Sequence, residues 1–404
     1  MIRRTIKFIQ EFMRLEAASG ILLFISAVLA ITIVNSPWQY HYDSLLHLSF
    51  SVGFSDFLLT ETLLHWVNEG LMAIFFLLVG LEIKREVVQG ELDTLSKSTL
   101  PISAAIGGMV APALIYLIFT HHDSIALKGW AVPCATDIAF ALGVLKLLGN
   151  RIPQSLKIFL MALAIFDDLG AILIIAFFYT NSLMYFALFE AFICVLGLFC
   201  LNYFNVRRLF PYIFIGVFLW YFILQSGIHA TIAGVLVAMF IPVVIRSKDP
   251  EEPSHITVAH VSPLKILEKN LHPWVAFGIL PLFAFFNAGL SFKNISLPAI
   301  VSPVPLGIAL GLLIGKQVGI FSASWIVVKC RIARLPTHVS WQTLYGVAVV
   351  CGVGFTMSLF IGNLAFENYA MIYSNWLRLG VLLGSLLAGI LGYSICHFQH
   401  PKKV

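Results

Sequence analysis

The apolar residues of this chain are gathered into long runs whose length matches the thickness of a lipid bilayer. A spanning helix needs about 20 mostly apolar residues, and twelve runs of about this length follow one another with short connections. They cover residues 12–34, 62–83, 99–119, 129–146, 156–179, 183–204, 209–225, 227–245, 272–291, 304–328, 341–366 and 374–397. The pattern predicts an all-α polytopic membrane protein with about twelve transmembrane helices. No Pro/Ser-rich linker or low-complexity tract separates the runs, so we expect one integral membrane domain over residues 1–404.

The connection between the first two runs, residues 35–61, has a different periodicity. Its apolar residues alternate with small or polar ones, a period of two that is typical of a β-strand. These residues are Leu46, Leu48, Phe50, Val52 and Phe54. We expect a small exposed β-hairpin here. Because an exposed edge strand can pair with another chain, the hairpin is also a candidate dimer contact.

The basic residues fix the orientation of the twelve predicted helices. The side that holds the N-terminus carries 21 of the 25 Lys and Arg residues, and the opposite side carries three. The remaining one, Lys316, lies inside a predicted helix. Because short cytoplasmic connections are enriched in Lys and Arg, we expect both termini to be cytoplasmic.

The overall composition supports a membrane protein and argues against other classes. Apolar residues make up 59% of the chain and charged residues 11%, with a mean hydropathy of +0.93. Soluble domains average about 25% charged residues. The net charge of +5 is modest, and the basic residues form no stripe that would indicate a nucleic-acid partner. The six cysteines form no CxxC pair and have no metal-ligand spacing with His, so we interpret them as packing residues.

Three predicted helices carry a charge near their midpoints, where the bilayer makes a charge costly and therefore usually functional. Asp137 lies in the fourth run, the adjacent pair Asp167 and Asp168 in the fifth, and Lys316 in the tenth. A helix cap or a solvated loop is the alternative explanation for the aspartate pair. The long apolar sequence on both sides of the pair argues against this alternative.

The paired aspartates suggest a chemistry of cation and proton exchange. Two adjacent carboxylates cannot both ionise cheaply in an apolar surrounding without a cation, so protons and a small hard cation compete for the same oxygens. With the Thr136 hydroxyl nearby and no His or Cys cluster, the donors suit Na⁺ better than a transition metal. Calcium also accepts oxygen ligands and stays open. Lys316 is either a structural counter-charge or a partner that Asp167 loses when the cation binds.

Two of the runs are poor continuous helices. Pro133 interrupts the fourth, and Gly352 and Gly354 interrupt the eleventh. Interruptions at corresponding places in two halves indicate a transporter site, and this spacing fits an inverted repeat of helices 3–5 and 10–12. If the breaks cross, Asp137 would offset the positive half-helix ends and Lys316 the negative ones. Kinked but unbroken helices remain the alternative.

Six segments together resemble the NhaA-type sodium/proton antiporters, a family known for inverted repeats. They are Phe75–Glu82, Ala135–Gly143, Phe166–Gly170, Ser226–Thr231, Leu271–Val275 and Gly352–Ser358, in order across nearly the whole chain. The resemblance implies a single transporter domain with twelve helices, of which the broken fourth and eleventh cross. It implies Asp167 and Asp168 as the cation and proton site, and Asp137 and Lys316 as charge compensators.

The resemblance also implies how the protein works in the cell. We expect a secondary transporter, not an enzyme, that needs no cofactor and exchanges cytoplasmic Na⁺ or Li⁺ for periplasmic protons. The exchange is expected to be electrogenic and activated at alkaline pH. The expected location is the bacterial inner membrane, as a homodimer joined through the periplasmic hairpin.

The residues that match the family's pH-regulating positions share a place near the cytoplasmic side. They are Glu82, Arg85, Glu86, His229 and Glu268. An ordinary interfacial ion-pair cluster is the alternative for the first three, and a packed histidine is the alternative for His229. Two positions depart from the family pattern: Glu69 replaces an aspartate, and Lys269 follows Glu268 where a histidine is expected.

Other functions use similar residues but fit less well. A K⁺ or Ca²⁺ exchanger would use the same carboxylates. An intramembrane aspartyl protease needs two aspartates on separate helices sharing a proton, and Asp137 with Asp168 satisfies that on paper. No Gly-x-Gly-Asp segment follows, because Gly354 leads into Phe355. A channel would also use buried acids, but Lys316 beside a single site favours a gated carrier.

Overall fold

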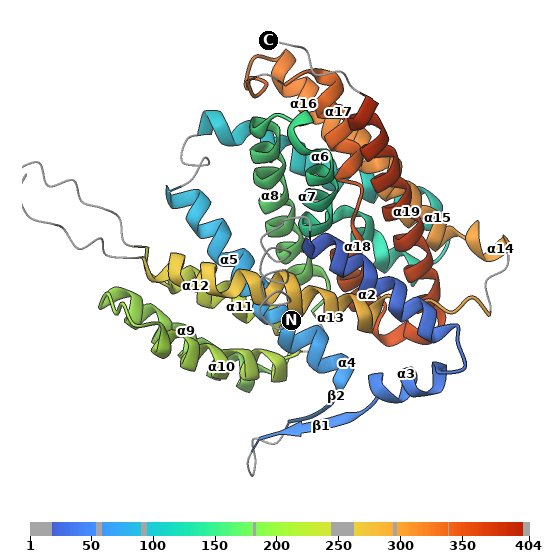
Figure 1. Cartoon of the computed structure of the whole chain (residues 1–404). Coiled ribbons are helices and arrows are strands. Elements are labelled where there is room, and N and C mark those ends of the chain that lie inside the picture. Colours follow the sequence, from blue (N-terminus) through green and yellow to red (C-terminus); the bar gives the residue numbers. More distant parts are fainter. Residues whose placement is uncertain are drawn as a thin grey trace, which may run out of the picture. The chain divides into compact units, whose positions relative to one another are not determined.

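The computed structural model consists almost entirely of helices (Figure 1). It describes residues 18–53, 59–89, 95–180, 183–243, 262–293, 297–337 and 339–398. In the first half, the helices are α2 (Ala18–Val34), α3 (Gln39–Leu46), α4 (Leu63–His65), η2 (Trp66–Leu71), α5 (Met72–Gln89), α6 (Leu95–Thr120), η3 (Ala126–Cys134), α7 (Ile138–Leu147), η4 (Gly149–Arg151), α8 (Gln154–Phe178) and α9 (Tyr185–Tyr203). They continue with α10 (Leu209–Gln225), α11 (Thr231–Phe240), α12 (Pro263–Trp274), η5 (Val275–Ile279), α13 (Leu280–Asn287), α14 (Leu297–Ile300), α15 (Pro303–Leu310), η6 (Gly311–Gly315), α16 (Lys316–Lys329), α17 (Trp341–Val350), α18 (Phe355–Ala365), η7 (Glu367–Tyr369) and α19 (Ala370–Phe398).

Each of the twelve predicted runs contains helix, so the all-α class of the fold is confirmed. In the described part, five helices are long and apolar enough to cross a membrane, or up to eight if each bent pair is one span. The count of twelve membrane crossings stays a prediction. The ninth run starts earlier than its hydropathy indicates, because α12 begins at Pro263 and is amphipathic. Part of the first run, residues 12–17, lies outside the described residues.

The chain divides into two compact units. One comprises residues 1–68, 94–179 and 276–404, and the other comprises residues 69–93 and 180–275. We call them the large and the small unit and describe each by itself. The single domain over residues 1–404 stays a prediction.

The large unit contains two bent helix pairs at the places where the sequence predicted breaks. The axes of η3 and α7 differ by 41°, and those of α17 and α18 by 47°. The residues between the halves lie against each other, since the Asp137 amide donates to the Val353 carbonyl over 2.7 Å. The alternative of merely kinked helices is therefore wrong, because the backbone ladder is interrupted in both.

Close backbone packing in the large unit sets the position of Lys316. The preceding segment η6 is a π-helix, and it packs on α6 through glycines. A Cβ atom added to Gly315 would lie 2.6 Å from the Cα atom of Pro112, so no larger residue fits there. This contact brings the start of α16 against α6 and turns Lys316 toward the interior, where its side chain is fully buried.

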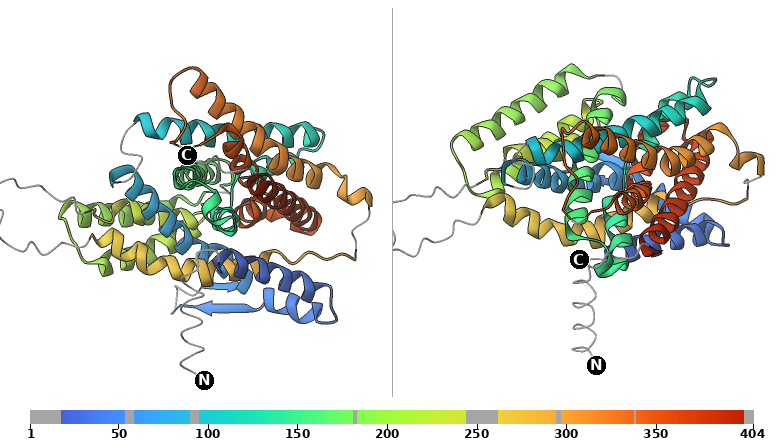
Figure 2. Two further views of the ribbon diagram at one scale, coloured as in Figure 1. Left: turned by 45° about the horizontal axis from the view of Figure 1, so that its top comes forward. Right: turned by 90° about the horizontal axis from the view of Figure 1, so that it is seen from above.

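The predicted hairpin is present in the large unit. Strand β1 (Ser49–Val52) pairs antiparallel with β2 (Leu59–Thr62), and Ser49 lies opposite Thr62 (Figures 1 and 2). Leu46 was expected to begin the alternating strand but ends helix α3, and Phe54 lies outside the described residues. All four residues of β1 are exposed, so its outer edge is open to solvent.

The small unit is built from α5, α9, α10, α11 and α12. α9 and α10 pack side by side (Figure 2), and α5 packs on α11 through Gly80, where an added Cβ would lie 2.7 Å from that of Ala238. The Lys84 ammonium donates to the carbonyls of Met239 and Ile241, both over 2.6 Å. These are carbonyls at the C-terminal end of α11, which a cation stabilises.

Candidate functional site

Asp167 and Asp168 lie in the middle of helix α8, as the sequence predicted. Each is 1% exposed. Neither caps a helix, because α8 continues for more than two turns on both sides. The two carboxylates are therefore held in the interior of the large unit, where ionisation requires a nearby positive charge.

Lys316 supplies a positive charge to Asp167. Its Nζ atom donates to both carboxylate oxygens, over 2.9 Å and 3.1 Å, and also to the Cys134 carbonyl. Cys134 is the last residue of η3, so the ammonium also lies at the C-terminal, negative end of a half-helix. The pair is fully enclosed, since Lys316 is 0% exposed.

Thr136 connects the first break to the second. Its hydroxyl donates to the Cys351 carbonyl over 3.0 Å, at the end of α17, and Thr136 also lies within hydrogen-bonding reach of the Asp167 carboxylate. It is completely buried. The hydroxyl oxygen and the backbone carbonyls of the break are thus gathered around Asp167.

Asp137 lies at the N-terminal ends of two half-helices at once. Its Oδ1 atom accepts from the Phe140 amide of α7 over 2.9 Å. Its Oδ2 atom accepts from the Thr356 amide of α18 over 3.0 Å and from the Thr356 hydroxyl over 2.5 Å. A carboxylate is stabilised by such unpaired amides and by the positive end of the helix dipole. Asp137 therefore lies at the N-terminal, positive ends of both α7 and α18.

The donor set at this site suits a hard cation. It contains carboxylates, a hydroxyl and backbone carbonyls, which are ligands for ions such as Na⁺. The described residues include no group of three or more His, Cys, Asp and Glu side chains that could hold a metal ion. In the structure, Lys316 occupies both oxygens of Asp167.

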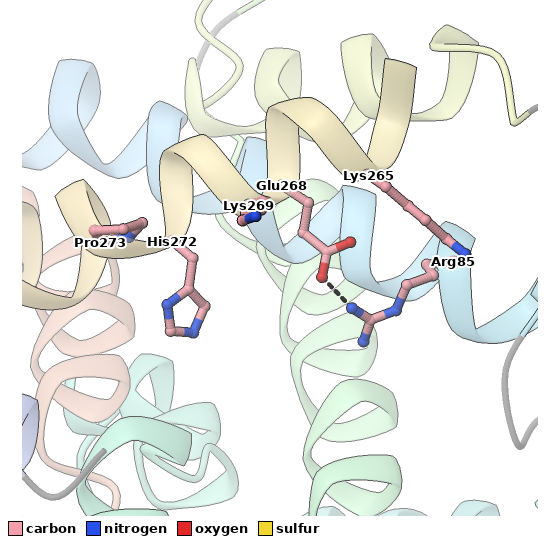
Figure 3. Close-up of a pocket in the computed structure, with 6 residues that line it drawn as sticks. All are labelled: Arg85, Lys265, Glu268, Lys269, His272 and Pro273. Carbon is pink, nitrogen blue, oxygen red and sulfur yellow. Dashed lines mark hydrogen bonds and ion pairs between the residues drawn. The ribbon is translucent and has the colours of Figure 1, made fainter. Parts of the chain in front are cut away.

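The small unit brings together the charged residues matched to pH regulation. Arg85 pairs with Glu268 of α12 (Figure 3). Arg85 also donates to Glu86 over 2.7 Å. Glu82 lies close enough to Arg85, Glu86 and Glu268 to interact with them electrostatically. A cavity of about 540 Å³ lies beside this cluster. It is lined by Arg85, Lys265, Glu268, Lys269, His272 and Pro273 (Figure 3).

Lys84 belongs to the same end of α5, just beyond the predicted span. Burial lowers the pKa of Lys84 to about 8. Because the ammonium binds the last carbonyls of α11, its deprotonation in the alkaline range weakens the attachment of α11 to α5. No local sequence pattern indicated this contact.

His229 lies apart from the Arg85–Glu268 cluster, beside Glu69. The Nδ1 atom of His229 is 3.6 Å from Glu69 Oε1, and the Ala230 amide donates to Glu69 Oε2 over 3.0 Å. Both side chains are buried, at 8% and 6% exposure. Sequence reasoning assigned no role to Glu69, although a lone carboxylate in an apolar run is a usable signal. Thr356, which binds Asp137, was also missed.

Comparison with known proteins gives a consistent result over the full length. The model of the family described as Na⁺/H⁺ antiporter 1 matches residues 10–396. The chain is 54% identical over 390 residues to the Na⁺/H⁺ antiporter NhaA of Rhodospirillum rubrum, covering 96% of each chain. It is 51% identical over 395 residues to that of Vibrio parahaemolyticus, covering 98% of each. It is 51% identical over 392 residues to that of Pseudomonas putida, covering 97% of each.

Proposed function

Because this chain belongs to the Na⁺/H⁺ antiporter family, we propose that it exchanges Na⁺ for protons at the buried Asp167–Asp168 pair. It is a membrane transporter and not an enzyme, and the transported ions are Na⁺ and H⁺, with no cofactor. The observation that carries the site assignment is the bonding of Lys316 to both oxygens of Asp167 beside the crossing breaks. A Na⁺ ion that enters this site displaces the Lys316 ammonium from Asp167. Binding of the cation is thereby coupled to release of protons.

The exchange cycle follows from the competition for the carboxylates. When Na⁺ binds, it takes the Asp167 oxygens from Lys316, and Asp168 gives up its proton. The displaced Lys316 gives up a second proton, and its amine remains near the Cys134 carbonyl, at the negative end of η3. When protons return from the other side, Na⁺ leaves and Lys316 pairs with Asp167 again. Two protons exchanged for one Na⁺ would make transport electrogenic.

The proposal also includes the number of membrane-spanning helices, their orientation and the location in the cell. We propose twelve membrane-spanning helices, an inverted repeat of helices 3–5 and 10–12, and both termini in the cytoplasm. The basic residues on one side of the predicted helices support this orientation. The relatives are bacterial antiporters, which supports a place in the bacterial inner membrane.

An assay in everted vesicles tests the function directly. A preformed pH gradient should collapse when Na⁺ or Li⁺ is added, and K⁺ or Ca²⁺ should have little effect. The comparison is made from pH 6.5 to 8.5, the range in which alkaline activation is expected. If the gradient persists with Na⁺ but collapses with Ca²⁺ or K⁺, the transported ion is Ca²⁺ or K⁺ and not Na⁺. The protease alternative is not favoured by the comparisons.

We propose that Glu82, Arg85, Glu86 and Glu268 adjust the pH at which exchange begins, with His229 and Glu69 as a separate buried pair. Glu268→Gln removes a negative charge that holds protons in the cluster, so activation should move to lower pH by about half a unit. Lys269→Gln removes a positive charge from the same cavity and should move activation the opposite way. Exchange rates across pH 6.5 to 8.5 measure both shifts. Two unmoved profiles, or shifts of the same sign, would contradict the role of this cluster.

We propose that the β1–β2 hairpin joins two copies of the chain. The open edge of β1, with Phe50 and Val52 exposed, supports this role. Replacing residues 49–60 by a short Gly-Ser turn should lower the dimer fraction severalfold in a crosslinking experiment in membranes. Equal dimer yields with and without the hairpin would remove it from the interface.

A further inference from the structure

Three asparagine side chains form a continuous hydrogen-bonded chain in the large unit. Asn363 on α18 donates from its side-chain nitrogen to the side-chain oxygen Oδ1 of Asn287 over 2.7 Å. Asn287, the last residue of α13, donates from its side-chain nitrogen to Oδ1 of Asn68 over 2.8 Å. We call these three residues the asparagine chain. It connects α18 and α13 to η2, which come from three distant parts of the sequence.

The direction of these hydrogen bonds is set by the backbone. Asn287 Nδ2 also donates to the Phe283 carbonyl over 2.9 Å, so its amide nitrogen must face that oxygen. Its oxygen then faces Asn363, which must present its own nitrogen. Asn287 is 1% exposed, and a buried amide without partners is unfavourable. The chain is thus a directional contact and not an incidental one.

The asparagine chain shares helix α18 with the exchange site and is displaced from it toward the predicted outer side. Along α18, Thr356 binds Asp137, Phe360 follows one turn later, and Asn363 lies two turns on. Phe360 makes an edge contact with Phe283 of α13, with ring centroids 6.1 Å apart. Three successive layers result: a carboxylate with a hydroxyl, an aromatic pair and the asparagine chain.

We propose that the Asn68–Asn287–Asn363 chain is a reversible seal on the outer side of the exchange site. An exchanger must close one side of its site while the other is open, and this inference rests on the proposed function. Amides suit the task because they exchange partners with water at little net cost when the path opens. Carboxylates in these places would retain the cation, and apolar side chains would make no directional bonds to hold the contact closed.

The access of a water-soluble reagent to the site tests the seal. Cys134 and Cys351 are buried at the two breaks and serve as reporters, after Cys194, Cys200, Cys330 and Cys396 are replaced by serine or alanine. A membrane-impermeant methanethiosulfonate is applied to right-side-out vesicles and, separately, to inverted vesicles. The labelling rate from the outer side should rise about tenfold in Asn287→Leu, which loses three hydrogen bonds, and severalfold in Asn363→Leu, which loses one. Labelling from the inner side should not rise.

Asn35→Leu is the matched control. Asn35 also makes three hydrogen bonds in the large unit, to Ile31, Leu290 and Phe292, but lies outside the asparagine chain. Its labelling rate should stay at the level of the parent protein. Equal labelling in all variants, or an equal rise in the control, would overturn the seal. If Asn287→Leu does not reach the membrane, the half-buried Asn363→Leu decides the result. Na⁺/H⁺ exchange by the wild type in the same vesicles tests the proposed function separately.

Discussion

Asp168→Asn should abolish Na⁺-dependent collapse of the pH gradient in everted vesicles while leaving the protein folded. The substitution keeps the shape of the side chain but removes a buried negative charge that has to hold either a proton or Na⁺. Loss of a charge–cation interaction in a buried site is worth several kcal/mol, so we expect a decrease of about a hundredfold or more. Asp167→Asn should be equally inactive. It should also be less stable, because Lys316 then loses its carboxylate partner.

The control for this prediction is Asp43→Asn, the same substitution on exposed helix α3. It should exchange Na⁺ at the wild-type rate. Calorimetry of Na⁺ binding in buffers of different ionisation enthalpy gives a second measurement. The wild type should release protons as Na⁺ binds, and Asp168→Asn should release fewer. Full exchange by Asp168→Asn, or Na⁺ binding without proton release in the wild type, would remove the aspartate pair from the mechanism.

Lys316→Ala should destabilise the protein by about 3–5 kcal/mol, the usual cost of removing one partner of a buried ion pair. The carboxylate of Asp167 would remain enclosed without its ammonium, and the Cys134 carbonyl would lose its donor. The expected results are a lower melting temperature in detergent, a lower yield in membranes and reduced exchange. Melting curves of the purified variants measure the effect.

Two variants separate loss of the pair from general damage. Lys329→Ala, on an exposed position at the end of the same helix, should change stability by no more than about 0.5 kcal/mol. The double variant Asp167→Asn/Lys316→Met removes both charges, so it should be more stable than Lys316→Ala and yet inactive. If Lys316→Ala melts with the wild type, Lys316 does not stabilise Asp167.

The sequence alone predicted much of the fold because a bilayer leaves few choices. A helix that crosses the membrane needs a long apolar run, so the runs are visible without any tertiary information. For the same reason each charge within a run stands out, and Asp137, Asp167, Asp168 and Lys316 were found in this way. Pro133 and the glycines around Val353 marked the two breaks, since they disrupt the helical backbone locally.

The amphipathic helix α12 shows where this kind of prediction is weaker. Its charged residues lower the mean hydropathy, so the ninth run appeared to begin at residue 272, whereas the helix begins at Pro263. The expected strand likewise included Leu46, which ends α3. In both places a feature other than mean hydropathy accompanies the boundary, since Pro263 stands in the first turn of α12 and Leu46 is a buried residue of α3.

Only the tertiary structure decided which groups meet. Asp137 and Thr356 are separated by 219 residues, and Glu69 and the Ala230 amide by 161. No local sequence pattern predicts such contacts. A polar residue in an apolar run indicates that it needs a hydrogen-bond or charge partner, but it does not indicate which residue is that partner. Asn68, Asn287 and Asn363 carry no charge and were not noticed in the sequence at all. The bilayer thus fixed what has to be buried and roughly where, whereas the packing of distant helices determined the partner of each buried polar group.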